Sequence, residues 1–115
     1  MPRRLRRLVE RASFLRAAKG SKIVKPGFVL QVVASEGDDI GVGFTASKRV
    51  GNAVARNRAR RRLREVARTV LPDHGLAGHD HVLVARPATV AYPFAALTAD
   101  LTEALAMARE RVRKR

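Results

Sequence analysis

The sequence predicts a single small α/β domain, an α+β two-layer sandwich in which about four strands pack with three helices in the order α-β-β-β-α-β-α. Three observations lead to this fold class. The chain of 115 residues is long enough for one core and too short for two ordinary domains, so we expect one domain over residues 1–115. Its hydrophobic fraction of 46% is that of a globular protein. Segments with helical spacing of apolar residues also occur together with segments in which apolar and polar residues alternate.

The N-terminal segment has the spacing of an amphipathic helix. Its apolar residues recur every three or four positions, at Leu5, Leu8, Ala12 and Leu15. This spacing predicts a first helix over roughly residues 4–18, with those side chains on the buried stripe. The turn dipeptides Lys19-Gly20 and Pro26-Gly27 follow it.

Two strands come next, FVLQVVAS at 28–35 and IGVGFTAS at 40–47, and the polar turn EGDD between them predicts a hairpin. One face of the second strand is apolar, and the other consists of Gly41, Gly43, Thr45 and Ser47. Because glycine weakens a strand, this nearly bare face indicates the close approach of another backbone or of a ligand.

The central segment has the pattern of a core helix. Asn52 is the expected N-cap, and Pro72 is expected to end the helix after Leu71. The predicted buried stripe consists of Ala55, Ala59, Leu63, Val66 and Val70.

The C-terminal third contains a further strand and a last helix. HVLVARP at 81–87 predicts the strand, and Pro93 stands near the N1 position of the helix. The apolar stripe of this helix consists of Phe94, Leu97, Leu101, Leu105, Ala108 and Val112. The basic tail at about residues 110–115 is expected to fray into solvent.

The chain carries a formal net charge of +14 and no cysteine. Nearly all of the excess lies in two blocks, residues 1–26 and 48–68, each with nine basic residues and one acidic residue. A domain that folds both blocks onto one side presents one positive surface, which indicates a polyanionic partner. The absence of cysteine excludes a disulfide framework and a thiolate zinc site, which suits a cytoplasmic protein. The apolar runs are too short to span a membrane.

Arginines crowd the exposed side of the central helix, where ARNRARRRLR occupies residues 55–64. The first turns contain no acidic residue to complement the helix dipole. A phosphate at this N-terminus would meet the dipole, free N–H groups and arginine guanidinium groups together. The alternative from spacing alone is a solvated charged face or a short localisation-type basic run.

The run VGFTASKRVGNAVARNRARRRLREVAR at 42–68 resembles the signature of the bacterial ribonuclease P protein subunit. The marker of that family is an arginine-asparagine-arginine triplet on the helix after a G-N-A-V turn, here Arg56, Asn57 and Arg58. The resemblance also covers the basic first helix, PGFVL at 26–30 and GHDHVLVARP at 78–87, and so nearly the whole chain.

The resemblance implies a small α/β protein joined to a large catalytic RNA, one protein for each RNA. In that family the RNA and its Mg²⁺ ions remove the 5′ leader from precursor tRNA, while the protein binds no cofactor alone and holds no catalytic residue. It also implies an unusual left-handed β-α-β crossover through the central helix, although physical principles favour a right-handed one. The triplet helix would contact the RNA subunit and nearby substrate, and a cleft between sheet and helix would take the leader.

The residues expected to bind RNA, from the charge pattern and the resemblance together, are Lys48, Arg49, Asn52, Arg56, Asn57, Arg58, Arg60, Arg61, Arg62, Arg64 and Arg68. Phe14 and Gln31 are expected in the leader cleft. Phe14 lies opposite Leu5 on a helical projection, where a ring can stack on an unpaired base, and the alternative is that it covers a sheet edge. Ala18 and Gln31 replace aromatic residues of the family, so we expect poorer stacking, with hydrogen bonding by Gln31 in part of its place.

Other functions find less support in the sequence. His74, His79 and His81 do not form a helical metal pair, so we expect ordinary polar edge residues, with a metal ligand as the weaker alternative. Carboxylates clustered for a two-metal nuclease, or a nucleophile with its base, do not occur at recognisable spacing. A membrane-surface role is disfavoured because the first helix is short and has no tryptophan. A general RNA-binding or ribosome-associated module without a part in catalysis shares every basic feature and stays open.

Overall fold

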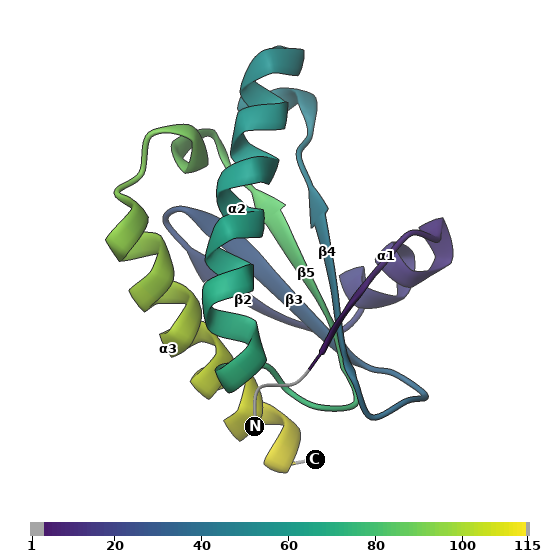
Figure 1. Cartoon of the computed structure of the whole chain (residues 1–115). Helices are drawn as coiled ribbons and strands as arrows, with labels where there is room; N and C mark the ends of the chain where they lie inside the picture. Colours follow the sequence, from purple (N-terminus) through teal and green to yellow (C-terminus); the bar gives the residue numbers. More distant parts are fainter. Residues whose placement is uncertain (1–3, 115) are drawn as a thin grey trace.

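The computed structural model describes residues 4–114; residues 1–3 and 115, which the predicted domain and tail include, lie outside the described residues. A mixed five-stranded sheet carries two long helices on one face and a short helix on the other (Figure 1). The strands are β1 (Leu5–Arg7), β2 (Ser21–Lys25), β3 (Phe28–Ala34), β4 (Ile40–Thr45) and β5 (His79–Ala85). The helices are α1 (Arg11–Ala18), α2 (Ala53–His74) and α3 (Phe94–Arg113), with short 3-10 turns η1 (Lys48–Val50) and η2 (Pro87–Val90). The predicted class is confirmed, with one strand more than expected.

β5 lies in the middle of the sheet, whose strand order is β1-β4-β5-β3-β2. It pairs parallel with β4 and antiparallel with β3, so the hairpin predicted over residues 28–47 is wrong. The hairpin that does form joins β2 to β3 through Pro26-Gly27. β5 is central because all of its residues except His79 and Val84 are buried, and a strand buried on both faces needs neighbours on both edges.

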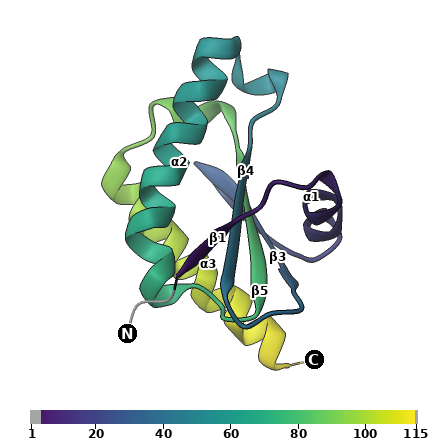
Figure 2. The same ribbon diagram turned by 45° about the vertical axis from the view of Figure 1, so that its right-hand side comes forward.

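The N-terminal segment is a strand and a shorter helix, instead of one helix over residues 4–18. β1 lies beside β4 and pairs parallel with it (Figure 2). The Leu8 amide donates to the Val42 carbonyl at 2.9 Å. The helical spacing is misleading here because an extended chain places Leu5 and Leu8 on opposite faces of the sheet, where each finds apolar partners. Leu15, predicted on the buried stripe, is 53% exposed.

The apolar residues form two unequal clusters, one on each face of the sheet. The larger lies between the sheet and the two long helices, and its largest side chains include Phe28, Leu63 and Leu101. The smaller lies under α1 and has three buried members, Leu8, Ala17 and Val82. Stability therefore comes mainly from the α2–α3 layer, and α1 is held by few apolar contacts.

The connection from β4 through α2 to β5 joins two parallel neighbouring strands. In Figure 1 both strands run upward, β5 lies to the left of β4, and α2 descends in front of the sheet. This is the left-handed sense that the family resemblance implies. With this connection, α2 begins beyond the end of the sheet at which β4 stops, and its N-terminal half extends past the strands.

α2 keeps its predicted start and buried stripe but runs past its predicted end. The Asn52 side chain accepts a hydrogen bond from the Ala55 amide at 2.9 Å, which confirms the N-cap. Ala59, Leu63, Val66 and Val70 are buried, and Ala55 is half-buried. The helix includes Pro72 and ends at His74, because a proline in the last turn removes only one helical donor and the Gly75 amide still bonds the Leu71 carbonyl at 2.8 Å.

α3 begins directly after Pro93 and continues through Arg113, so residues 110–113 are helical and not frayed as expected. Its predicted stripe is buried at Leu97, Leu101, Leu105 and Ala108, half-buried at Val112, and exposed at Phe94. The last turns are fixed because Arg111 Nη1 donates to the Lys22 carbonyl at the free edge of β2, at 2.7 Å. Lys25 and Glu103 form an ion pair between the same two elements.

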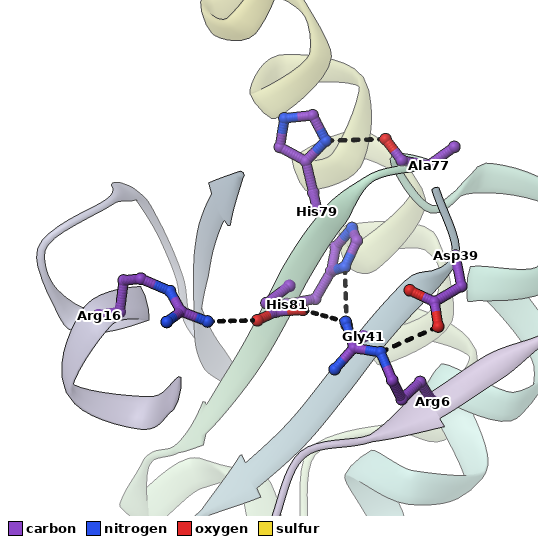
Figure 3. A network of polar contacts seen from close by, with 8 residues as sticks. Arg6, Arg16, Asp39, Gly41, Ala77, His79 and His81 are labelled. Atoms are coloured by element: carbon purple, nitrogen blue, oxygen red, sulfur yellow. Dashed lines mark hydrogen bonds and ion pairs between the residues drawn. The ribbon is translucent and has the colours of Figure 1, made fainter. Parts of the chain in front are cut away.

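His81 is fully buried in the central strand, not at an edge as expected. Its Nε2 accepts from the Leu76 amide at 3.1 Å, so the proton resides on Nδ1, which donates to the Gly41 carbonyl at 3.0 Å (Figure 3). Burial lowers the pKa of His81 from its ordinary 6.5 to about 4. The neutral ring thus links β5, β4 and the chain after α2.

This buried ring predicts a loss of stability in mild acid. Between pH 6.5 and 4 the unfolded chain protonates His81 and the folded chain does not, so the free energy of unfolding should fall by roughly 3 kcal/mol over this range. Denaturant unfolding at a series of pH values measures it. His81→Gln should remove this part of the pH dependence and His79→Gln should retain it; equal slopes for His81→Gln and the wild type contradict the assignment.

Candidate nucleic-acid interface

The N-terminal half of α2 extends past the end of the sheet (Figure 1). Most of the arginines of α2 as a whole are at exposed positions. The exposed members of the predicted set on this helix are Asn57, Arg58, Arg61, Arg64 and Arg68, and the half-buried ones are Arg56, Arg60 and Arg62. Glu65 is the only acidic residue between positions 53 and 72, and its carboxylate pairs with Arg68 at 3.1 Å. The helix therefore presents positive charge with little internal compensation.

The turn before α2 adds two further cations. Lys48 and Arg49 are exposed in η1, where Ser47 Oγ accepts from the Arg49 amide at 3.3 Å. Gly51 has φ +142°, a region that favours glycine, and it turns the chain from η1 into the helix. Asn52 uses its side-chain oxygen as the cap, which leaves its NH₂ group as the donor available to a ligand.

Besides Arg68, three more of the predicted arginines contact the protein itself. Arg62 donates from Nε to the Thr89 carbonyl at 3.0 Å and from Nη2 to the Tyr92 carbonyl, so it fastens the segment after β5 to α2. Arg60 donates to Asn57 Oδ1. The Arg64 guanidinium lies over the Phe44 ring, 5.8 Å from its centroid. Arg58 and Arg61 are exposed, and with Val54, Asn57, Arg60 and Arg64 they line an open hollow.

A groove of about 330 Å³ runs beside these arginines, between the N-terminal segment and α2. Its walls are Arg7, Leu8, Val9, Phe14, Gly43, Phe44, Arg60 and Arg64. We call it the Phe14 groove. It brings the predicted aromatic residue together with two predicted arginines, although they are far apart in sequence.

The bare face of β4 has two explanations in the structure. A Cβ on Gly43 would lie 2.7 Å from atoms of the Phe14 ring, so the ring rests directly on the strand backbone. A Cβ on Gly41 would lie 2.1 Å from Asp80 Oδ1 and 2.8 Å from Arg6 Nη2. The close approach expected at these glycines is therefore an approach of the protein's own side chains.

Gln31 lies on the same face of the sheet as Phe14 but does not line the groove. It is opposite Val82 in β5, and Val82 is opposite Gly43 in β4, so two strand spacings, about 10 Å, separate Gln31 from the strand under the Phe14 ring. Ala18 is exposed at the end of α1. Phe14 and Gln31, which were expected to share one cleft, thus lie on one continuous face of the sheet but not in one pocket.

The sequence-based prediction missed Arg7 and Phe44 as groove residues. The helix predicted over residues 4–18 includes Arg7, and only the pairing of Arg7 with Val42 in the parallel strand shows which way it faces. Phe44 belongs to the face of IGVGFTAS that the sequence predicts to be apolar, yet it is half-buried because the core helix carries Arg64 above it. An aromatic residue at the end of a strand, followed by a basic turn, is the feature that could have indicated it.

The histidines and acidic residues do not gather into a metal-binding group. Within residues 4–114, no cluster of three or more histidine, cysteine, aspartate or glutamate side chains could hold a metal ion. His79 Nδ1 contacts the Ala77 carbonyl at 2.9 Å, and His81 uses both of its ring nitrogens in the core. In the same described range, no helix has the length and apolar character needed to cross a membrane.

Comparisons with known proteins agree on one family. The family model described as Ribonuclease P matches residues 1–109. The Ribonuclease P protein component of Paramagnetospirillum magneticum is 49% identical, covering 91% of this chain and 84% of that protein. That of Ruegeria pomeroyi is 51% identical, covering 85% and 82%. The solved RNase P protein of Staphylococcus aureus is 30% identical with a TM-score of 0.73, covering 89% of this chain and 94% of that one.

The contacts of Arg62 predict a structural contribution that its neighbour lacks. Arg62→Gln should lower the free energy of unfolding by about 1.5 to 3 kcal/mol, because two carbonyl groups lose a charged donor. Arg61→Gln removes the same charge from an exposed position and should change stability by less than about 0.5 kcal/mol. Urea unfolding of both variants measures the difference, and equal stabilities contradict it.

Proposed function

The chain belongs to the ribonuclease P protein family, and from this membership we propose that it binds the RNA subunit of ribonuclease P and the 5′ leader of precursor tRNA. In this role the RNA subunit and its Mg²⁺ ions cleave the leader in the cytoplasm, one protein serves each RNA, and no protein side chain performs chemistry. The observation that carries the proposal is the exposed arginine face of α2, where the Glu65–Arg68 pair supplies little internal countercharge.

The arginine face is proposed as the contact with the RNA subunit. Its cations on α2 are Arg56, Arg58 and Arg61, joined at the margins by Arg60, Arg64 and Arg68, and Lys48 and Arg49 of η1 extend it. They surround a helix N-terminus whose first turn holds no acidic residue, and a phosphate there would gain from the dipole and from guanidinium donors at once. Arg62 contributes less, because two of its donors are already used inside the protein.

The Phe14 groove is proposed as the place where the leader enters. A single strand is held by cations along its backbone and by aromatic faces under its bases, and the groove supplies Arg7, Arg60 and Arg64 together with Phe14. Gln31 lies further along the same sheet face, where its amide could bond a base edge. The leader would thus cross the sheet from the arginine face toward β3.

The rival function is a general RNA-binding module without a part in tRNA maturation. It shares the charged surface, but the family membership and the groove beside that surface favour a dedicated subunit. Sequencing the RNA that stays bound through a high-salt purification separates the two, since a dedicated subunit should retain one dominant structured species.

Reconstitution tests the proposal directly. Added to the matching RNA subunit, the protein should restore cleavage of precursor tRNA at low Mg²⁺, because its cations supply countercharge that the ions otherwise provide. The protein alone should cut nothing. Cleavage by the protein alone, or no effect on the RNA, refutes it; gel analysis of the 5′ product gives the answer.

Salt dependence tests the arginine face. Neutralising Arg56, Arg58 and Arg61 to glutamine should weaken RNA binding and lower the slope of log K against log salt by about 2 to 3, since each phosphate contact contributes roughly 0.7 to 0.9. The matched control neutralises Lys22, Arg113 and Lys114, exposed cations away from this surface. An unchanged slope for the first triple, or an equal decrease for the control, removes these arginines from the interface.

A further inference from the structure

Asp80 is a buried carboxylate that joins three separate elements. It lies in the central strand with 1% of its surface exposed. Its Oδ1 accepts from Arg6 of β1 at 2.6 Å, and its Oδ2 accepts from Arg16 of α1 at 3.3 Å. In Figure 3 the two arginines reach toward this strand from opposite sides. Arg6 also pairs with Asp39 at 2.9 Å, and these hydrogen bonds, to Asp39 first and Asp80 second, raise the pKa of Arg6.

The segment that Asp80 holds has little else to fix it. α1 has eight residues, too few to be stable as an isolated helix, and Ala17 is its only buried residue. β1 has three residues and pairs along one edge only. A buried carboxylate is costly unless it is paired, so Asp80 and its two arginines favour one position of this segment over others.

The same segment supplies half of the Phe14 groove. Arg7, Leu8, Val9 and Phe14 form the wall opposite β4 and α2. The position of that wall relative to Arg60 and Arg64 therefore depends on how firmly β1 and α1 are held to the sheet. Gly41 is part of the same arrangement, because any side chain there would displace the Asp80 carboxylate.

We propose that Asp80 is a positioning residue: through Arg6 and Arg16 it sets the width of the Phe14 groove and so the preference for substrates that carry a single-stranded 5′ extension. This rests on the proposed function of the groove. Asp80 itself has 1% of its surface exposed, so we assign its effect to its two arginine partners and not to direct contact with a nucleic acid.

The variant Asp80→Asn distinguishes a positioning role of Asp80 from a long-range electrostatic effect, because the two predict opposite changes in the binding of precursor tRNA. Asp80→Asn makes the chain more positive by one charge, so long-range attraction predicts tighter binding of every RNA. Loss of the ion pairs with Arg6 and Arg16, in contrast, predicts weaker binding of precursor tRNA and no change for mature tRNA. In the complex with the RNA subunit, we expect the ratio of affinities for leader-containing precursor and mature tRNA to fall about fivefold to tenfold, with affinity for mature tRNA within twofold of the wild type.

A matched pair of arginine variants covers the case in which Asp80→Asn folds poorly. Arg16→Gln removes one partner of Asp80, whereas Arg11→Gln removes the same charge from the exposed start of the same helix. Arg16→Gln should lower the precursor preference and Arg11→Gln should leave it within twofold. Phe14→Ala serves as a reference, because it shows how far the preference for precursor tRNA falls when the groove loses its aromatic ring. Equal behaviour of Arg16→Gln and Arg11→Gln overturns the proposal.

Hydrogen exchange of the free full-length protein tests the same idea without any RNA. In Asp80→Asn the amides of Leu8 and Gly20, which bond the Val42 and Ala17 carbonyls, should exchange about tenfold faster or more, and the amide of Leu63 less than threefold faster. Unchanged exchange at Leu8 and Gly20, or a uniform increase in all elements, overturns the positioning role. If the wild-type complex shows no preference for precursor, the groove function itself fails, and the exchange result still decides the role of Asp80 in the fold.

Discussion

β5 pairs with β4 on one edge and with β3 on the other, and successive side chains of this strand serve opposite faces of the sheet. His81 and Leu83 point into the α2–α3 layer, while Asp80 and Val82 point toward α1. One strand thus connects the large core to the weakly held N-terminal segment. β5 follows α2 in the chain, so the arginine-rich helix lies in the connection between the two parallel strands β4 and β5.

Burial of apolar side chains in the large core offsets the repulsion within the charged surface. α2 buries six apolar residues under the same turns that carry its arginines, so burial of that stripe offsets the repulsion between like charges. Acidic residues are used sparingly and in particular places. Asp39 and Asp80 neutralise Arg6 and Arg16 beside the groove, whereas the N-terminal half of α2 has no such partner before Glu65. Positive charge is therefore concentrated where a polyanion can reach it.

Features that depend on neighbouring residues were predictable from the sequence. The cap at Asn52, the buried stripe of α2 and the start of α3 after Pro93 follow from local periodicity and from the chemistry of helix ends. Features that depend on distant pairing were not. Nothing local indicates that residues 79–85 separate the two strands thought to form a hairpin, or that Leu5 lies in a parallel edge strand. The same holds for the candidate site. The arginine face was predictable from the spacing of residues along one helix, but the contact of Phe14 with Gly43 and its position near Arg64 could be seen only in the folded structure.

The contact between Arg111 and the Lys22 carbonyl bears on how the protein behaves before it meets a partner. β2 is the outer strand of the sheet, and an outer strand with unpaired backbone groups can recruit strands from other molecules and grow into aggregates. A guanidinium on one of its carbonyls and the ammonium groups of Lys22 and Lys25 along it make that growth unfavourable. Shortening α3 by its last turn would remove this contact and leave the edge of the folded protein more open to self-association.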